Sequence, residues 1–307
     1  MKYPPGLIVI VGATATGKTS LAIQLAQTLS LPILNGDSRQ VYRYFDIGTA
    51  KPTLTQQQGV PHHLLDIAEP DAPLTVAMYQ QQAQGLIQTF HQQGVTPILV
   101  GGSGLYIRAI IAGLTMPAIA PQPDLRHQLS QLGQEQCHAL LQHLDPPSAA
   151  KIHGHDSVRT LRALEVFYCT GQPLSQLCAA CPPPYPIWQF GLPTPPAPLY
   201  RQSLGDRTRA MLAAGWLAEV QSLRHRYGAQ LPLLRTLGYA ELGEHLDGHI
   251  PLSEATVQIE QHTYQFAKRQ RTWFAGKGKE PHPIHWLYGS PTENLSDILH
   301  SLRGSST

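Results

Sequence analysis

The sequence predicts an α/β fold built on a parallel sheet, with a mainly helical domain inserted into it. Two observations predict this class. Over residues 1–113, short apolar runs that end in glycine-containing polar loops alternate with helical patterns. From about Leu114 the patterns are helical, and a proline-rich segment follows before helical patterns return. We therefore expect a core of residues 1–113 and 199–307 and an inserted helical domain of residues 114–198.

The first predicted strand covers residues 7–11, and a phosphate-binding loop follows it. Helical spacing of Leu21, Leu25 and Leu29 comes next, so the order is buried strand, glycine loop and helix. In such a P-loop, backbone amides and a helix N-terminus bind phosphates, a lysine adds charge and a threonine hydroxyl can bind Mg²⁺. A chance match in a turn is the alternative. The sequence thus predicts a P-loop NTPase-like core whose diphosphate-binding residues are Gly12, Ala13, Thr14, Ala15, Thr16, Gly17, Lys18 and Thr19.

Two further strands end in polar loops that carry candidate catalytic residues. Residues 31–34 lead to Asp37, and residues 96–100 lead to a glycine loop that contains Ser103. Ligands of open parallel sheets bind beyond the carboxyl ends of the strands, so both side chains should meet the P-loop there. The second strand lacks the terminal Asp of an ATPase, which weakens an ATPase or kinase interpretation. Asp37 is a candidate general base, or otherwise the cap of the next turn.

The rest of the chain is expected to be mostly helical. In the insert, leucines recur from Leu125 to Leu144, and a further helix covers 158–170 before Gly171. Prolines then surround one extended strand near Trp188. Helices are expected over 204–223 and, capped by Ser253, up to about residue 274, and a last strand over 284–287.

Basic residues concentrate in two places. Arg159 and Arg162 share one face of the insert helix, and residues 267–274 hold three cations and two aromatics, with Lys277 and Lys279 close behind. Such residues can hold RNA phosphates, and a solvated helix end is the alternative.

Composition excludes several classes of protein. The net charge of +2 over 307 residues favours no partner, and no apolar run approaches a membrane span. We therefore expect a soluble cytoplasmic protein that does not contact membranes. The four cysteines are too few for a disulfide framework, and the Cys178-x-x-Cys181 pair lacks the further ligands of a zinc site.

Taken together, the motifs resemble those of the tRNA dimethylallyltransferases, a family of tRNA prenyltransferases. The resemblance covers residues 7 to about 287 in family order. It rests on the P-loop and on GDSRQVY at 36–42, DIGTAKP at 46–52, PHHLLD at 61–66, GGSGLY at 101–106, RALEV at 162–166, GY at 238–239 and AKRQ at 267–270.

The resemblance implies transfer of a dimethylallyl group from its diphosphate to N6 of the adenosine 3′ of the anticodon. Asp37 would be the base, with Ser103 and Arg207 as further catalytic groups, and Mg²⁺ on Thr19 as cofactor. The P-loop would bind prenyl diphosphate in place of a nucleoside triphosphate. The insert would hold the anticodon stem-loop, and we expect a monomer. The implied tRNA-binding residues are Asp37, Ser38, Arg39, Gln40, Ser103, Arg126, Arg159, Arg162, Gly238, Tyr239, Lys268, Arg269 and Gln270.

Four positions depart from the family pattern. Ser103 replaces a usual threonine and Ala13 a usual proline, and both changes are mild. Ser203 and Tyr264 stand where the family commonly has arginine, so we expect somewhat weaker RNA or diphosphate binding. A small-molecule phosphotransferase and a non-catalytic RNA-binding protein remain the other two readings. Intact Lys18, Thr19 and Asp37 argue against the second.

Overall fold

The computed structural model describes residues 5–72, 74–117, 119–276 and 282–304. The chain divides into two compact units, which are described separately here. The core unit comprises Met1–Ile111 and Pro184–Thr307, and the helical unit comprises Ala112–Pro183. The helical unit begins near the predicted residue 114 but ends well before residue 198. The prediction was wrong at that end because the strand near Trp188 joins the core sheet.

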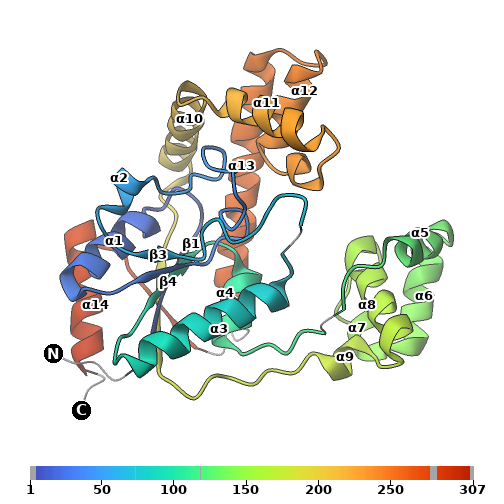
Figure 1. Ribbon diagram of the computed structural model, residues 1–307, viewed down its shortest axis with the longest axis horizontal. Coiled ribbons are helices and arrows are strands. Elements are labelled where there is room, and N and C mark those ends of the chain that lie inside the picture. The colour runs from blue at the N-terminus through green and yellow to red at the C-terminus, as the bar shows by residue number, and fades with distance from the viewer. Residues whose placement is uncertain (1–4, 73, 118, 277–281, 305–307) are drawn as a thin grey trace. The chain divides into compact units, whose positions relative to one another are not determined.

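The core unit is organised on a six-stranded parallel sheet in the order β3-β2-β4-β1-β5-β6 (Figure 1). The central strand pairs Ile10 with Val100 on one side and with Phe190 on the other. The structure confirms all five predicted strands. It adds a two-residue strand that is too short for a periodic signal. The strands are β1 (Leu7–Gly12), β2 (Ile33–Asn35), β3 (His62–His63), β4 (Ile98–Gly101), β5 (Ile187–Leu192) and β6 (Ile284–Trp286).

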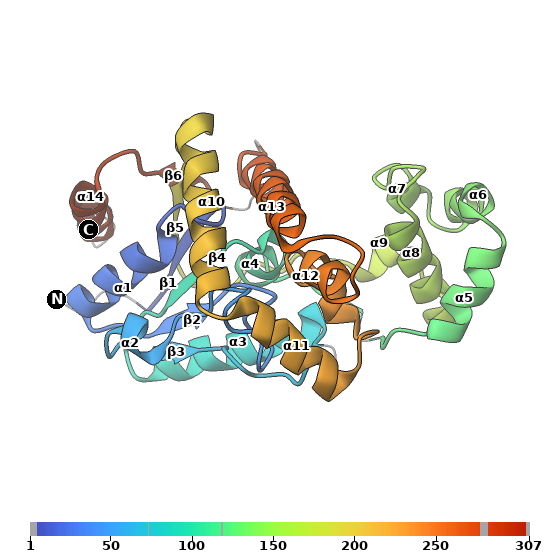
Figure 2. The ribbon, with the colours of Figure 1, turned by 90° about the horizontal axis from the view of Figure 1, so that it is seen from above.

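Helices cover both faces of this sheet, which explains why β1 is apolar without interruption. Side chains alternate along β1, so Leu7, Val9 and Val11 face one core cluster while Ile8 and Ile10 face the other. The first cluster includes side chains of α3 (Val76–Gln92) and α4 (Gly104–Ile111). The second includes side chains of α1 (Lys18–Leu29) and α14 (Pro291–Gly304). These two helices lie next to each other (Figure 2).

The C-terminal helices of the core unit differ from the prediction in two details. The helix expected over 204–223 is two helices, because Gly215 adopts a left-handed φ of 102° between them. The long helix has Pro251 as its N-cap, and Ser253 lies inside its first turn. These elements are α10 (Ala197–Ala213), α11 (Trp216–Tyr227), η1 (Pro232–Arg235), α12 (Tyr239–Leu246) and α13 (Leu252–Phe274), and the short α2 (Leu54–Gln57) precedes β3.

The helical unit has its own small core. Leu129, Cys137, Leu141 and Leu164 are buried together in it. The predicted end of one helix at Gly171 is confirmed, because this residue is its left-handed C-cap. The helices are α5 (Pro123–Gln131), α6 (Gln134–Leu144), α7 (Pro146–Ala149), α8 (Ser157–Thr170) and α9 (Leu174–Leu177).

The four cysteines are free thiols. Across the described ranges, no helix combines the length and the apolar character that crossing a membrane requires.

Candidate functional site

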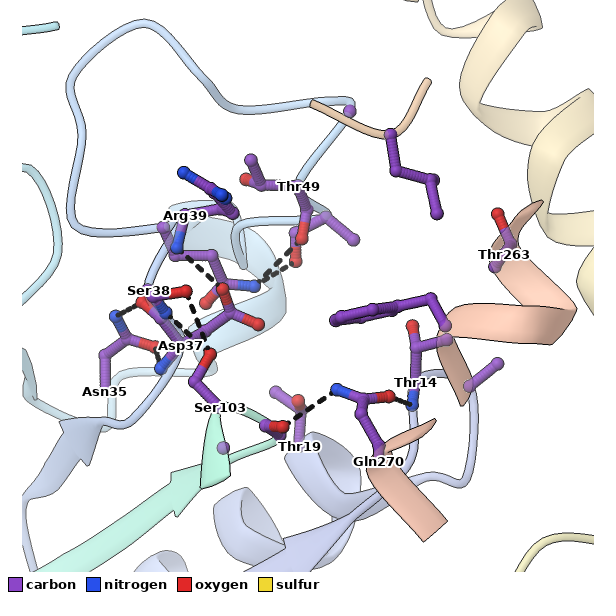
Figure 3. Close-up of a pocket in the computed structure, with 18 of the residues that line it drawn as sticks. Thr14, Thr19, Asn35, Asp37, Ser38, Arg39, Thr49, Ser103, Thr263 and Gln270 are labelled. Carbon is purple, nitrogen blue, oxygen red and sulfur yellow. Dashed lines mark hydrogen bonds between the residues drawn. The ribbon is translucent and has the colours of Figure 1, made fainter. Parts of the chain in front are cut away.

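A cavity of about 770 Å³ lies in the core unit beyond the carboxyl ends of β1, β2 and β4 (Figure 3). The P-loop and the loops after β2 and β4 form one side of it, and α10 and α13 contribute the other. Parallel strands bring their carboxyl ends to one edge, so segments that are distant in sequence meet here. The predicted convergence of the P-loop, Asp37 and Ser103 is therefore present in the structure.

The P-loop connects β1 to α1 and forms the floor of the cavity. Five of its residues line the cavity: Thr14, Ala15, Gly17, Lys18 and Thr19. The other three, Gly12, Ala13 and Thr16, support the loop from below. The Thr16 hydroxyl donates a hydrogen bond to the Ala13 carbonyl at 2.9 Å, and Lys18 Nζ donates to the same oxygen at 3.1 Å. The loop leads directly into the N-terminus of α1 at Lys18, where the first amides have no partner within the helix and can bind an anion.

Two desolvated cations face Asp37 across this floor. Burial lowers the pKa of the Lys18 ammonium to about 8, while Asp37 raises it and Arg207 lowers it. Burial also lowers the pKa of Arg207, again against the influence of Asp37. Neither cation forms an ion pair with a carboxylate in the described part of the chain. Partly buried cations that have no carboxylate partner are typical of a site that binds an anionic ligand.

A buried asparagine fixes the position of Asp37. Asn35 Oδ1 accepts a hydrogen bond from the Asp37 amide at 3.0 Å, and Asn35 Nδ2 donates to the Asp37 and Leu64 carbonyls at 3.1 Å each. Asp37 Oδ1 in turn accepts the Arg39 amide at 2.8 Å. This is the capping contact that was the alternative to a catalytic role. It occupies one carboxylate oxygen, and no hydrogen bond to the other oxygen is present within the described residues.

Ser103 holds the loop that follows Asp37. Its Oγ accepts the Ser38 amide at 2.9 Å and donates to Ser38 Oγ at 3.1 Å. Next along this loop, Gln40 Nε2 donates to the carbonyls of Thr49 and Ala50. Ser38, Arg39 and Gln40 all line the cavity. The two predicted motifs, 36–42 and 101–106, are therefore parts of one hydrogen-bonded wall.

The 46–52 motif forms a second loop at the cavity. Its lysine, Lys51, connects it to the 61–66 motif. Lys51 is buried, and its Nζ lies 2.5 Å from Asp46 Oδ1, 2.6 Å from Asp66 Oδ1 and 2.8 Å from the Tyr42 carbonyl. Asp66 ends the 61–66 motif. One ammonium thus ties these two segments together.

Glu219 anchors the same loop from α11. Its carboxylate accepts the amides of Asp46, Ile47 and Gly48 at 3.0, 2.7 and 3.1 Å. It also accepts the Tyr239 hydroxyl at 2.7 Å. Burial raises the pKa of Tyr239, and Glu219 raises it further. Tyr239 therefore stays a hydrogen-bond donor that packs on Phe45 and Trp216 and positions the loop.

Gln270 connects the P-loop to the end of β4. Its Oε1 accepts the Thr14 amide and its Nε2 donates to the Gly102 carbonyl, both at 2.9 Å. A side chain at Gly102 would collide with this amide, since a Cβ there would lie 2.4 Å from Gln270 Nε2. Both ends of the Gln270 amide are engaged with backbone. Gln270 therefore positions the P-loop against the end of β4, and its RNA contact stays a prediction.

The other predicted RNA-binding residues lie in different surroundings. Arg269 and Tyr239 line the cavity, whereas Lys268 is exposed outside it. Gly238 is the buried N-cap of α12, and its amide donates to Glu241 at 2.6 Å. The three arginines of the helical unit, Arg126, Arg159 and Arg162, are engaged with carboxylates. Lys277 and Lys279 lie outside the described residues.

In the helical unit, two of those arginines enclose Glu165, which is fully buried. Arg126 Nε and Nη2 donate to its two oxygens at 2.8 and 2.7 Å, and Arg162 Nη1 donates at 2.5 Å. The Gln122 amide adds a bond of 2.6 Å. Burial raises the pKa of Glu165, but these hydrogen bonds outweigh burial and hold it at about 2. Arg159 differs, because it is exposed and its guanidinium lies 3.4 Å from the partly exposed carboxylate of Asp156.

Sequence reasoning missed three residues that shape the site. Asn35 carried a usable signal, since it is the last residue of a buried strand and lies two residues before Asp37. Tyr200 donates its hydroxyl to the Thr14 carbonyl at 2.6 Å. Glu219 contacts residues about 170 positions away. The last two act across long sequence separations, which local patterns do not report.

Apolar side chains form part of the cavity wall, beside polar side chains of the same helices. Ile259, Phe266 and Trp273 from α13 and Met211 from α10 line it, and Leu105 joins them from α4. A ligand with an anionic end on the P-loop and an apolar body along this wall suits such a cavity.

Comparison with known protein families agrees with the motifs. A family model described as "IPP transferase" matches residues 40–277. A tRNA dimethylallyltransferase of Thermosynechococcus vestitus is 59% identical over 294 residues, which are 95% of this chain and 93% of that protein. One of Acaryochloris marina is 56% identical and covers 98% of both chains.

Solved structures show the same architecture. The tRNA isopentenylpyrophosphate transferase of Bacillus halodurans superposes with a TM-score of 0.72 at 34% identity and covers 98% of both chains. A eukaryotic dimethylallyltransferase acting on tRNA superposes with a TM-score of 0.70 at 27% identity, over 87% of this chain and 69% of that one.

Proposed function

Since this chain belongs to the tRNA dimethylallyltransferase family, we propose that it transfers the dimethylallyl group of dimethylallyl diphosphate to N6 of adenosine 37, next to a tRNA anticodon. The products are N6-isopentenyladenosine and diphosphate. One observation supports this above all: Asp37 and two desolvated cations face one cavity whose wall is partly apolar. The cations suit the diphosphate, the wall suits the five-carbon chain, and the carboxylate suits an amine.

In this proposal Asp37 orients the nucleophile. Its oxygen without a protein partner accepts a hydrogen bond from the exocyclic N6 amine. N6 attacks the allylic carbon, the bond between that carbon and the bridging diphosphate oxygen breaks, and the electron pair leaves with diphosphate. The amine proton passes to Asp37. Asn35 and the Arg39 amide hold the carboxylate in place.

The P-loop cations stabilise the leaving group. Negative charge grows on the bridging oxygen as the bond breaks, and Lys18, Arg207 and the amides of the first turn of α1 surround the place where it develops. Because these groups are already desolvated, little reorganisation is needed during the reaction. Ser103 contributes by holding Ser38, and thereby the Asp37 loop, in position.

Thr19 is the residue that would hold Mg²⁺. Its side chain lines the cavity and makes no hydrogen bond within the described residues. No cluster of three His, Cys, Asp or Glu side chains suited to a metal exists in the same residues. This donor set fits Mg²⁺ only if diphosphate and water supply most of its oxygen ligands. When bound, the ion would neutralise charge on the leaving diphosphate.

The acceptor adenosine has to leave its stacked position to reach this cavity. A base inside a stem-loop exposes N6 only after it turns outward, so we propose a flipped nucleotide. Arg39 and Arg269 at the cavity are suited to its flanking phosphates. Since tRNA is a cytoplasmic substrate, we propose a cytoplasmic enzyme.

Transfer of radiolabel from dimethylallyl diphosphate to an anticodon stem-loop tests the proposal. Wild type should label the RNA, and Asp37→Asn should lower kcat by about 10²–10⁴-fold because it removes the base and keeps the shape. Asp297→Asn, an exposed change on α14, is the matched control and should leave the rate unchanged. No labelling by wild type, with ATP consumed on a small acceptor, would instead indicate a phosphotransferase.

A further inference from the structure

Helix α13 presents two different faces near the P-loop. Ile259, Thr263, Phe266, Gln270 and Trp273 follow helical spacing and line the cavity. Tyr264, Lys268 and Arg271 also follow helical spacing but lie on another face, and none of them lines the cavity. This second face therefore needs an explanation apart from the reaction.

Aromatic rings connect this face to the P-loop. The Tyr200 hydroxyl donates to the Thr14 carbonyl, and the Tyr200 ring lies 6.2 Å from the ring of Tyr264. The Arg201 guanidinium lies over the Tyr264 ring, 3.8 Å from its centroid. Tyr264 also packs against a small buried cluster that includes Ala13 of the P-loop. Arg201 is thus held at a fixed place beside the P-loop by a cation–π contact.

The face is cationic, and its charges are unpaired. Arg201, Lys268 and Arg271 are exposed and form no ion pair with the described residues. Burial raises the pKa of Tyr200 to about 12, while the positive charges of Arg207 and Arg271 lower it. Asp206 and Glu260 on these helices both contact Arg209 instead. Within the residues that the structure describes, no carboxylate forms an ion pair with any of the three cations.

We propose that Arg201, stacked on Tyr264, and Arg271 form a second phosphate-binding surface, which holds the RNA backbone beside the P-loop and outside the catalytic cavity. The proposal rests on the proposed function, because it assumes an RNA substrate. Charge complementarity favours a polyanion, and position favours the RNA over the prenyl diphosphate. The diphosphate already has Lys18 and Arg207 inside the cavity, whereas this face is open to solvent.

This surface also bears on two departures from the family pattern. Ser203 and Tyr264 were expected to weaken binding because each lacks a cation that relatives commonly have there. Arg201 lies two residues before Ser203 and uses Tyr264 as its platform. A cation therefore reaches this place from another position of α10.

Binding of an anticodon stem-loop, measured by fluorescence anisotropy over a series of salt concentrations, tests the surface. Arg201→Gln should raise Kd about three- to tenfold, and it should lower the slope of log K against log salt by roughly 1. Arg201→Gln with Arg271→Gln should lower the slope by roughly 2. The weakening should be equal for a stem-loop whose target adenosine is replaced, because phosphate contacts carry no sequence information.

Two controls separate this role from general charge and from folding. Arg209→Gln removes one cation from the same helix, but Arg209 is paired with Asp206 and Glu260, so Kd and slope should not change. Tyr264→Phe keeps the ring and should bind like wild type. Tyr264→Leu removes the platform and should reproduce part of the Arg201→Gln loss.

Kinetics complete the test. Arg201→Gln should raise KM for the RNA and leave both kcat and KM for dimethylallyl diphosphate unchanged. The proposed surface would be wrong if Arg201→Gln raised only the KM for dimethylallyl diphosphate, or if it changed neither KM and left the Kd for RNA unchanged. In both cases transfer by the wild type would still support the proposed function. If wild type binds RNA without labelling it and Arg201→Gln weakens that binding, the surface stands and the proposed reaction fails. Absence of RNA binding by wild type would overturn both.

Discussion

Cations at two sites, one in each unit, have opposite roles. In the helical unit, Arg126 and Arg162 surround the buried carboxylate of Glu165 with short hydrogen bonds. In the core unit, Lys18 and Arg207 are desolvated and have no carboxylate in ion-pair contact within the described residues. A buried charge that has its partner in the chain maintains the fold. One without a partner costs stability and indicates where a ligand brings the opposite charge.

Among these cations, a change at Arg207 should have the largest effect on the transfer rate. Arg207→Gln should lower the transfer rate about 10²–10³-fold, because one preorganised cation at the leaving group is lost. Stability to thermal unfolding should stay equal or increase, since a desolvated charge without a partner is removed. Single-turnover kinetics and a melting curve measure the two outcomes.

A matched change on the same helix serves as its control. Arg209→Gln removes a paired, exposed arginine and should change the transfer rate less than twofold. A variant at Arg207 that unfolds more readily, with a rate loss that follows its instability, would show that Arg207 is a structural residue like Arg126.

Glu165→Gln should have the opposite effects to Arg207→Gln, because it should lower stability and not the rate of the chemical step. It keeps the shape but leaves two guanidinium groups without their carboxylate, and we expect a loss of about 2–3 kcal/mol in the stability of the helical unit. All four tryptophans, at 188, 216, 273 and 286, belong to the core unit. Circular dichroism should therefore show an earlier transition than tryptophan fluorescence in this variant.

Acid provides a second measurement on the same carboxylate. The pKa of Glu165 falls from its usual 4.5 to about 2 in the folded state. Its contribution is therefore complete above pH 4.5 and is lost as pH falls toward 2. The Gln variant cannot titrate, so the stability difference between it and wild type should shrink over this range. A difference that stays constant from pH 5 to pH 2 would contradict the assignment.

The sequence allowed prediction of those features whose cause is local. Residues 7–11 could be predicted as a strand because a short, continuous apolar run is typical of a parallel-sheet strand that is buried on both faces. The P-loop could be predicted because consecutive residues specify it. Asp37 could be found because it follows a strand end. The partners of charges were harder to predict. Arg162 and Glu165 lie at positions i and i+3 of one helix, so their spacing alone predicts that the two side chains can form an ion pair. The contact of Gln270 with Thr14 spans 256 residues and depends on how α13 packs.

The comparison can be sharpened further by titrating Lys18. Its pKa falls from the usual 10.5 to about 8 in the ligand-free cavity. Above pH 8 the ammonium loses its charge, so KM for dimethylallyl diphosphate should rise by up to about tenfold per pH unit. Lys18→Arg stays charged throughout, so its KM should not rise between pH 7.5 and 9.

Stability should move in the other direction over the same range. Between pH 8 and 10.5 the unfolded chain binds more protons at Lys18 than the folded chain, so the free energy of unfolding rises with pH. Losing the charge thus weakens ligand binding while it strengthens the fold. Glu165 behaves differently, because losing its charge at low pH only weakens the fold. If wild-type affinity and stability both fell above pH 8, Lys18 would have an undetected partner in the chain and would belong with the arginines of the helical unit.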